Sequence, residues 1–493
     1  MHETGLEDAM HLGDLVPADV SVPAEARMLD IKGVSADSRS IAPGFLFAAL
    51  KGTETDGTRF VGEAVRRGAV AILAARGAAI ETSVPIIRAD DPRHALALIA
   101  GRFHPRQPEH LVAVTGTSGK TSVTDFTRQI FAASGHAAAS IGTLGIVTAK
   151  GTEYGTHTTP DPVAFHETLD RLAADDITHA AVEASSQGLD QRRVDGLRIQ
   201  AAAFTNLGRD HMDYHATVED YLAAKLRLFE VVLPPTGTAV IDMDGARAGD
   251  VLAVAKSRGQ KLIRVGKGGM EIELLSIQPS GFRQILSVDA FGKRREVVLP
   301  LAGAFQASNA LVAAGLAIAA GIGEDAAFRA LANLVGARGR LEFIGRKDNG
   351  ALAFVDYAHK PDAIVGVLGA LRPMTKGRLI AVIGAGGNRD RGKRPLMGKA
   401  AADNADVVIV TDDNPRFENP ASIRRAIISA APSAIEIADR REAIAHAVSM
   451  LGPDDVLVVA GKGHESGQIV GETTIPFSDQ ESVAAALGTE RAA

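Results

Sequence analysis

A glycine-rich turn with one lysine constrains this chain more than any other feature. The run Leu111–Thr115 is apolar enough to be a buried strand, and it breaks directly into the sequence GTSGKTS at 116–122. Such a turn between a strand and a helix surrounds phosphate oxygens with backbone N–H groups and brings a lysine ammonium to the β- and γ-phosphates. The motif therefore predicts a nucleotide site in a parallel α/β sheet.

The turn is a variant of the general phosphate-binding pattern, which would place glycine at 114, where this chain has Val114. Gly116 and Gly119 permit the tight cradle, Lys120 supplies the charge and Thr121 offers a hydroxyl to Mg²⁺. A chance glycine-rich turn is the alternative, but the strand directly before GKT favours nucleotide binding. The predicted nucleotide-binding residues here are Gly116, Thr117, Ser118, Gly119, Lys120, Thr121 and Ser122.

The 493 residues are enough for about three domains. Two X-Pro steps in FHPRQPEH indicate a linker, which sets the expected domains at 1–108, 109–337 and 338–493. Strand-like runs alternate with helical ones in the second segment, which predicts a doubly wound parallel sheet. Residues 272–301 alternate apolar and polar residues and predict a small antiparallel insertion.

Composition excludes several classes of protein. Cysteine is absent, so disulfides, thiolate metal sites and cysteine nucleophiles are excluded. A net charge of −6 without a basic run argues against nucleic-acid and anionic-membrane partners. The longest apolar stretch, 310–323, is too short to cross a bilayer and the N-terminus lacks the pattern of a secretory signal. We expect a cytoplasmic protein without membrane insertion.

Further acidic and imidazole groups follow two other strand-like runs. Glu183 ends the apolar run 177–183, and a carboxylate at such a strand tip helps hold Mg²⁺ in phosphate-loop enzymes, although helix capping is the commoner role. The segment 206–215 packs two aspartates and two histidines into six residues. This density suggests a second cation or a phosphate relay, and spacing alone leaves open which groups bind.

Lys225 falls among the apolar positions of a predicted helix, which Thr217 and Asp220 open as a capping box. Desolvation would lower the pKa of this lysine and free its amine for covalent chemistry. The alternative is a lysine whose stem packs on the surface while its ammonium reaches water. Spacing alone favours that alternative.

Three loops of the third segment carry charge at the ends of strand-like runs: 384–395, 411–416 and 461–465. Arginine suits bidentate recognition of carboxylates, and Glu465 suits an ammonium. Such loops are usually solvated surface. Because ligands of open α/β sheets bind beyond the carboxyl ends of strands, however, convergence of the three loops would make a pocket for a small zwitterion.

Taken together, these motifs resemble the Mur ligases over nearly the whole chain. The resemblance rests on 35–52, TGTSGKTS, EASSQGL, NLGRDHMDYH, KLRLF, 303–313, GRLE at 339–342, 356–363, 384–395, DNPR and GKGHE. It implies an α/β fold with three domains: a UDP-binding N-terminal domain, a central P-loop ATPase domain with a doubly wound parallel sheet, and a Rossmann-like C-terminal domain that receives an amino acid. Val114 fits the family's shorter TGTxGKT pattern.

The resemblance also implies an activity. A Mur ligase of the diaminopimelate-adding branch uses ATP to join meso-2,6-diaminopimelate to the D-Glu γ-carboxylate of UDP-MurNAc-L-Ala-D-Glu, through an acyl phosphate, in cytoplasmic peptidoglycan precursor synthesis. DNPR resembles that branch, because the second carboxylate of diaminopimelate gives Arg416 a partner that lysine lacks. A lysine-adding Mur ligase, a ligase like folylpolyglutamate synthase and a non-enzymatic ATP-binding regulator are the alternatives.

The resemblance assigns the ATP and metal roles residue by residue. Lys225 matches the lysine that the family carbamylates with CO₂, and as a carbamate it would be a ligand of a second Mg²⁺, which reverses the preference drawn from spacing. The residues implied for ATP and Mg²⁺ chemistry are Lys120, Thr121, Glu183 and His211, joined by the nucleotide contacts Asn309, Arg340, Asp356 and His359.

The remaining roles concern the two other substrates, and we expect a monomer. Residues implied for the uridine end are Ser38, Thr53, Glu54 and Thr55. Those implied for the muramoyl-dipeptide are Thr158, Thr159, Ser185, Gln191 and Arg193. The diaminopimelate pocket would comprise Arg389, Asp413, Asn414, Pro415, Arg416, Gly461 and Glu465.

Overall fold

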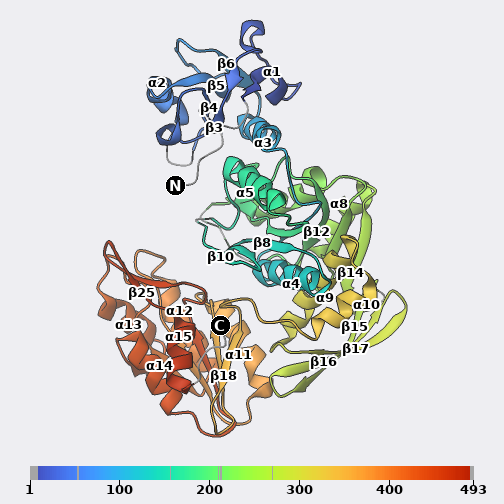
Figure 1. The fold of residues 1–493 in the computed structure, drawn as a ribbon. Helices are drawn as coiled ribbons and strands as arrows, with labels where there is room; N and C mark the ends of the chain where they lie inside the picture. Colours follow the sequence, from blue (N-terminus) through green and yellow to red (C-terminus); the bar gives the residue numbers. More distant parts are fainter. Residues whose placement is uncertain are drawn as a thin grey trace. The chain divides into compact units, whose positions relative to one another are not determined.

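The computed structural model describes residues 9–52, 55–155, 157–208, 210, 212, 214–268 and 270–488. The chain divides into two compact units. Figure 1 labels its helices and strands and colours the chain from the N-terminus (blue) to the C-terminus (red). The first comprises residues 1–120, 131–263 and 316–322, and the second comprises 121–130, 264–315 and 323–493. The three domain boundaries expected from the sequence stay a prediction.

The first unit begins with a small parallel sheet in the order β3-β4-β5-β6. Its strands are β3 (Gly33–Ser35), β4 (Phe45–Ala48), β5 (Ala69–Ala75) and β6 (Ile86–Ala89). Apolar clusters pack on both faces of this sheet. The short elements around this sheet are β1 (Met10–His11), α1 (Leu12–Leu15), β2 (Asp30–Ile31), α2 (Val61–Arg66) and α3 (Pro92–Phe103).

A larger sheet holds the glycine-rich turn. Its parallel strands lie in the order β8 (Ala138–Gly142), β11 (His179–Glu183), β7 (His110–Thr115), β12 (Ile199–Phe204), β13 (Thr238–Asp242). Strand β14 (Lys261–Gly266) follows β13, and β9 (Gly145–Thr148) and β10 (Gly151–Glu153) add antiparallel strands beside β8. Since β7 and β11 pair with Glu183 opposite Val114, the glycine-rich turn and this carboxylate leave the same edge of the sheet.

Helices of the first unit follow these strands. They are α5 (Pro162–Ala174), α6 (Ser186–Asp190), α7 (Val218–Arg227) and α8 (Ala248–Ser257). The capping box predicted for Thr217 and Asp220 is present at the start of α7, with both reciprocal hydrogen bonds made. Helix α4 (Lys120–Ala133) begins at the lysine of the glycine-rich turn.

The second unit contains a six-stranded sheet in the order β18-β19-β23-β20-β21-β22, parallel except for β18. The strands are β18 (Glu342–Arg346), β19 (Leu352–Asp356), β20 (Leu379–Ile383), β21 (Val407–Val410), β22 (Ile435–Glu436) and β23 (Val456–Ala460). Apolar clusters lie on both of its faces, as a doubly wound fold requires. Its helices are α11 (Pro361–Leu371), α12 (Lys393–Asn404), α13 (Pro420–Ile428), α14 (Arg440–Ser449) and α15 (Asp479–Leu487).

The predicted antiparallel insertion is also present in the second unit. Strands β15 (Ile272–Ser280), β16 (Arg283–Ala290) and β17 (Lys293–Leu299) form an antiparallel meander. Helices α9 (Ala304–Ala319) and α10 (Glu324–Leu331) follow, and β24 (Gly467–Val470) and β25 (Thr473–Pro476) make a hairpin near the end.

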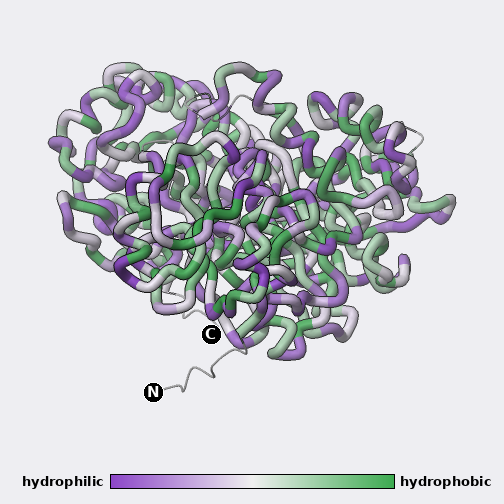
Figure 2. The backbone as a smooth tube through the Cα atoms, turned by 90° about the horizontal axis from the view of Figure 1, so that it is seen from above, coloured by the Kyte–Doolittle hydropathy of each residue, from purple (hydrophilic) through white to green (hydrophobic). Residues whose placement is uncertain are grey.

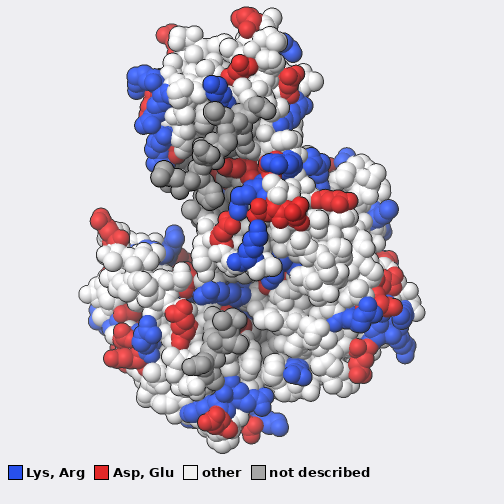
Figure 3. Space-filling model, viewed as in Figure 1, with Lys and Arg blue, Asp and Glu red and all other residues white. Residues whose placement is uncertain are grey.

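Hydropathy varies along the chain, and charges of both signs lie on its surface. Apolar runs, green in Figure 2, alternate along the tube with polar turns. On the face drawn in Figure 3, Lys and Arg (blue) are interspersed with Asp and Glu (red). Among the described residues no helix combines the length and hydrophobicity that crossing a bilayer needs.

Candidate active site

Two glycines set the conformation of the turn between β7 and α4. Gly116 has φ 145° and Gly119 has φ 87°. A Cβ on Gly116 would lie 1.9 Å from Thr205 Oγ1, so only glycine fits there. The loop is also tied to the end of β12, because Ser118 N donates to Asn206 Oδ1 (3.0 Å). The turn is therefore a braced cradle and not a loose surface loop.

Two lysines converge on one carbonyl of this cradle. Lys120 Nζ donates to Gly116 O at 2.9 Å and to Thr117 O at 3.1 Å. Lys225 Nζ donates to Gly116 O at 2.7 Å. It also lies 4.3 Å from the ring centroid of Tyr221, whose hydroxyl is 3.1 Å from Thr117 Oγ1. Helix α7 thus contacts the glycine-rich turn directly.

Lys225 is only 1% exposed, so the interpretation of a lysine that reaches water is wrong. Spacing identified the apolar face of α7 but not that the glycine-rich turn covers it. Burial, followed by the ammonium of Lys120, lowers the pKa of Lys225 well below its ordinary value, while Asp210 acts in the opposite direction. A lowered pKa favours the neutral amine, which is the nucleophilic form.

Glu183 is buried at the tip of β11, beside the glycine-rich turn in the sheet. Thr143 N donates to Glu183 Oε1 at 2.8 Å and Thr143 Oγ1 donates to Oε2 at 3.3 Å. A Cβ on Gly142 would lie 2.3 Å from Glu183 Oε1, so the neighbouring strand leaves room for the carboxylate only because it ends in glycine. The group is held by hydrogen bonds and does not cap a helix.

Part of the acidic and histidine-rich segment lies outside the described residues, including His211 and Asp213. In the described part of the chain, no three His, Asp or Glu side chains are grouped as a preformed metal site. Asp210 is half-buried and interacts electrostatically with Lys225 and Tyr221. The prediction of a second cation or phosphate relay here stays a prediction.

The five residues expected to hold the muramoyl-dipeptide form one connected cluster. Thr159 Oγ1 donates to Glu183 O at 2.8 Å and lies 3.0 Å from Ser185 Oγ. Arg193 Nη1 donates to Thr159 O at 2.8 Å. Two further contacts complete the cluster: Arg193 Nη2 donates to Gln191 Oε1 (2.8 Å), and the hydroxyls of Thr158 and Thr143 are 3.0 Å apart. The cluster therefore adjoins Glu183.

The residues expected at the uridine end are only partly described. Thr53 and Glu54 lie outside the described residues. Ser38 is buried and donates to Glu63 Oε2 at 3.2 Å. Thr55 is exposed, and its carbonyl accepts from Gly52 N at 2.8 Å.

In the second unit, the residues expected to contact the nucleotide lie together. Asn309 Nδ2 donates to Gln306 Oε1 (3.0 Å), and Gln306 Nε2 donates to Arg340 O (3.0 Å). The guanidinium of Arg340 lies 4.7 Å from the ring centroid of Tyr357, which is 4.6 Å from the ring of His359. Burial lowers the pKa of His359 to about 4. Its imidazole is therefore neutral at pH 7.

Asp356 ends β19 beside this group. Its carboxylate accepts hydrogen bonds from Leu341 N at 2.6 Å and Ala358 N at 2.7 Å. Burial nevertheless raises the pKa of Asp356 to about 6, against the opposing effect of Arg340. Perturbed carboxyl groups of this kind cluster at functional sites.

The three charged loops at strand ends converge, so they are not independent pieces of solvated surface. Arg416 Nη1 donates to Gly387 O at 2.9 Å, which joins the first two loops. Asn414 Nδ2 donates to Glu465 Oε2 at 2.8 Å, which joins the second and third. Arg416 has φ 51°, an uncommon conformation for a residue with a side chain. Pro415 and Asp413 are buried, and a Cβ on Gly461 would lie 2.7 Å from Asp413 Oδ2, whereas Arg389 is exposed at the loop surface.

Sequence reasoning missed Lys462, although it belongs to GKGHE. Its side chain is fully buried, and Nζ donates to Asn414 Oδ1 (3.0 Å) and to Glu465 Oε2 (2.9 Å). A lysine between two glycines gives no periodic signal for burial. Thr143 and Tyr221 were also missed, because their partners are far away in the sequence.

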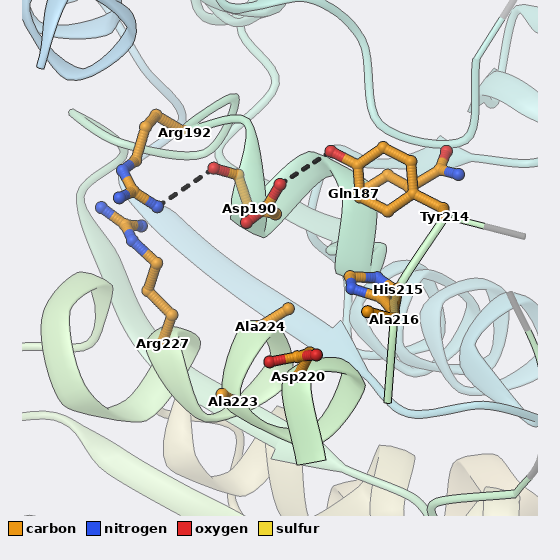
Figure 4. Close-up of a pocket in the computed structure, with 10 residues that line it drawn as sticks. All are labelled: Gln187, Asp190, Arg192, Tyr214, His215, Ala216, Asp220, Ala223, Ala224 and Arg227. Atoms are coloured by element: carbon orange, nitrogen blue, oxygen red, sulfur yellow. Dashed lines mark hydrogen bonds between the residues drawn. The ribbon is translucent and has the colours of Figure 1, made fainter. Parts of the chain in front are cut away.

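A polar cavity of about 950 Å³ adjoins α6 and the outer face of α7. Figure 4 shows that Arg192 and Arg227 approach it from one side and Tyr214 and His215 from the other. Tyr214 donates its hydroxyl to Asp190 Oδ2 at 2.7 Å. Of the acidic and histidine-rich segment, His215 lines this cavity, whereas none of the described residues that the resemblance assigns to a substrate or metal does.

Comparison with known proteins places this arrangement in a family. Three family models match: the Mur ligase family catalytic domain at 30–104, the Mur ligase middle domain at 114–317 and the Mur ligase glutamate ligase domain at 339–463. A protein of Brucella melitensis named UDP-N-acetylmuramoyl-L-alanyl-D-glutamate--2,6-diaminopimelate ligase is 54% identical over 97% of this chain and 98% of its own length. The chain belongs to the Mur ligase family.

Other Mur ligases support the same assignment. The protein of the same name from Agrobacterium fabrum is 53% identical over 94% of each chain. A solved structure of a UDP-N-acetylmuramoyl-L-alanyl-D-glutamate--2,6-diaminopimelate ligase superimposes with a TM-score of 0.74, at 32% identity, over 97% of this chain and 99% of that one. MurF ligase from Thermotoga maritima, at 20% identity and a TM-score of 0.60, shares the fold.

The predicted architecture and enzyme class are confirmed. The chain has the mixed α/β, parallel-sheet fold of the three-domain Mur ligases, and like them it is an ATP-dependent ligase. Mur ligases use ATP and Mg²⁺ in general. The alternative hypothesis of a non-enzymatic ATP-binding regulator is therefore set aside.

Proposed function

We propose that this Mur ligase joins meso-2,6-diaminopimelate to the D-Glu γ-carboxylate of UDP-MurNAc-L-Ala-D-Glu, with ATP converted to ADP and phosphate. The observation that carries the proposal is the identity of about 54% to a relative named for this reaction, over 97% of the chain. We also propose that the protein is a monomer, that it acts in the cytoplasm and that it contributes to cell-wall synthesis.

The glycine-rich turn and its two lysines support the ATP half of the reaction. Backbone N–H groups of residues 116–122 would bind the phosphates, and Lys120 would neutralise charge that develops on the γ-phosphate. The D-Glu γ-carboxylate attacks that phosphate, which gives an acyl phosphate and ADP. The Thr159–Ser185–Arg193 cluster adjoins Glu183, so it is suited to hold the dipeptide end of that substrate.

Two residues in or beside the glycine-rich turn are of the kind that binds Mg²⁺. Glu183 is a fixed, buried carboxylate, and Thr121 offers a hydroxyl at the start of α4. We propose that these two, with His211, hold the metal, which supplies charge neutralisation to the phosphates. The buried amine of Lys225 fits a carbamate, because its lowered pKa favours the neutral form that reacts with CO₂. As a carbamate it would provide an anionic oxygen ligand to a second Mg²⁺.

The acceptor half falls to the converging loops of the second unit. Arg416 would pair with a carboxylate of diaminopimelate, and Glu465, held by Asn414 and Lys462, would accept an ammonium. The reacting amine attacks the acyl phosphate, and the tetrahedral intermediate collapses to amide and phosphate. Diaminopimelate is then preferred over lysine because its second carboxylate pairs with Arg416. Lysine lacks this carboxylate.

A coupled assay of ADP release tests the proposal directly. The purified protein receives ATP, Mg²⁺ and UDP-MurNAc-L-Ala-D-Glu, with diaminopimelate in one arm and L-lysine in the other. We expect ADP release to depend on diaminopimelate, and Lys120→Ala to abolish it. Equal rates with lysine would overturn the acceptor assignment, and normal turnover of Lys120→Ala would overturn the role of the glycine-rich turn.

A further inference from the structure

Asp195 lies where three helices of the first unit meet. Its side chain is 2% exposed. Arg227, the last residue of α7, donates Nη1 to Asp195 Oδ1 and Nη2 to Oδ2, both at 2.6 Å. Nδ1 of His94, in the first turn of α3, lies 2.6 Å from Oδ2. One buried carboxylate therefore joins the start of α3 to the end of α7.

The backbone of Asp195 is fixed as well. Its carbonyl oxygen lies 3.1 Å from Nε2 of the buried His166, on α5. Helix α3 packs closely over that imidazole, because a Cβ on Gly101 would lie 2.8 Å from the ring. The backbone of Asp195 is thus held from α5, in addition to the contacts of its carboxylate with Arg227 and His94.

A second ion pair anchors the same end of α3. Asp91 caps the helix by accepting from Arg93 N and His94 N, and it also accepts from Arg192 Nε at 2.8 Å. Arg192 has φ 62°, a left-handed conformation that costs energy in a non-glycine residue. Arg192 and Arg227 both line the cavity drawn in Figure 4. Each of these arginines has a carboxylate partner, Asp91 for Arg192 and Asp195 for Arg227.

Two other side chains of α7 contact the glycine-rich turn. Lys225 precedes Arg227 by two residues in the last helical turn, and its Nζ donates to Gly116 O at 2.7 Å. Tyr221, one turn earlier, contacts Thr117. The bidentate pair fixes the last turn of α7, and that turn determines where the amine of Lys225 lies.

We propose that Asp195 is a positioning residue for Lys225: through Arg227, and with His94 as its second partner, it holds the end of α7 so that the lysine amine stays against the glycine-rich turn. The proposal rests on the proposed function for the role of Lys225 in turnover. Asp195 does not contact the glycine-rich turn itself in any described interaction, so it acts only through α7.

The test compares Asp195→Asn with Asp170→Asn in the full-length protein. Asp170 is a matched control. It lies on α5 and forms a bidentate pair with Arg106 (2.6 Å for Nη2–Oδ2), but it takes no part in the contact with α7. Three quantities are measured: kcat and KM for each substrate, hydrogen exchange of the amides at 218–227, and the ¹³C carbamate signal after equilibration with ¹³C-bicarbonate.

For Asp195→Asn we expect kcat to fall by roughly 10- to 100-fold, since a small displacement of a reacting group has effects of that order. KM for the substrates should change less than about twofold, because no binding group is removed. Exchange at 218–227 should rise and the carbamate signal should fall. Asp170→Asn should leave all three near the wild-type values. The proposal would be overturned if the two variants showed the same kinetics, the same amide exchange at 218–227 and the same carbamate signal.

A partner variant covers the case in which Asp195→Asn does not fold. Arg227→Gln removes the same bidentate pair from a side chain that is 13% exposed, and it should reproduce the kinetic and exchange changes. The double variant should lose less than the two single losses combined, because the two residues act as one pair. If the wild type itself shows neither a carbamate signal nor diaminopimelate-dependent ADP release, the proposed function fails. The exchange data then still decide whether Asp195 orders α7.

Discussion

Lys120 and Lys225 share one acceptor, the carbonyl oxygen of Gly116, at 2.9 and 2.7 Å. Burial and the ammonium of Lys120, which would repel a second cation on the same carbonyl, lower the pKa of Lys225. Converting one amine to an anion would remove that repulsion and pair the two groups. The arrangement therefore favours modification of the more deeply buried lysine.

Lys225→Arg tests this point. A guanidinium keeps the positive charge but does not form a carbamate, so we expect kcat to fall by about 100-fold or more, the scale of losing one charge-stabilising group. The measurement is ADP release with saturating substrates. Wild-type activity should also fall in CO₂-depleted buffer and recover with bicarbonate, whereas the variant should respond to neither. A fully active variant would rule out the carbamate.

Gly142→Ala should weaken metal use without replacing a proposed ligand. The new Cβ would meet Glu183 Oε1 at 2.3 Å, so the carboxylate must move. Displacing a ligand's surroundings commonly costs about 10- to 100-fold in metal affinity, and we expect the half-maximal Mg²⁺ concentration for turnover to rise about tenfold. Gly249→Ala is the control, because nothing lies within 4 Å of its Cβ. An unchanged Mg²⁺ dependence would remove Glu183 from the metal site.

Arg416→Ala should reduce discrimination between acceptors. A charge-assisted hydrogen bond is worth about 1.5–3 kcal/mol, which corresponds to a loss of roughly 10- to 150-fold in kcat/KM for diaminopimelate. The rate with lysine should change far less, because lysine lacks the second carboxylate. Arg391→Ala, an exposed arginine of the neighbouring loop, serves as the control. Parallel losses with both amino acids would assign Arg416 a structural role only.

His166→Asn should change how stability depends on pH. Burial lowers the pKa of His166 to about 4 from an ordinary value of 6.5, so the unfolded chain binds a proton that the folded chain does not between these values. Stability therefore falls as pH decreases from 6.5 toward 4. Between pH 7 and pH 5 this one group contributes a loss of about 2 kcal/mol.

Between pH 7 and pH 5, His166→Asn should lose about 2 kcal/mol less unfolding free energy than the wild type. Urea unfolding at the two pH values measures this difference. The exposed His446→Asn gives the reference for replacing a histidine on the surface. Identical pH dependence in wild type and His166→Asn would show that the buried imidazole does not resist protonation.

Features with a local sequence signal were predictable. The glycine-rich turn, the capping box at Thr217 and the strands that deliver Glu183 and DNPR each depend on neighbours within a few residues. Parallel sheets then bring strand ends together, so convergence of the loops could be expected without coordinates.

Features that depend on distant partners were not predictable in this way. The side chain of Asp195 bonds to residues 32 and 101 positions away, and nothing near it in the sequence marks it as buried. Lys225 was misjudged from spacing for the same reason: helical periodicity gives the apolar face but not what covers it. Lys462 lacks even a periodic context, and only its partners Asn414 and Glu465 explain its burial.

The double attachment of α3 has a consequence for protein engineering. A chimera that takes its first hundred residues from another Mur ligase would inherit a different residue at 91 or 94 unless the donor happens to match. Arg192 would then lose the carboxylate of Asp91, and Asp195 would lose the imidazole of His94 and keep only Arg227. Segment exchange in this family should therefore transplant the start of α3 together with the 190–195 turn, as one module.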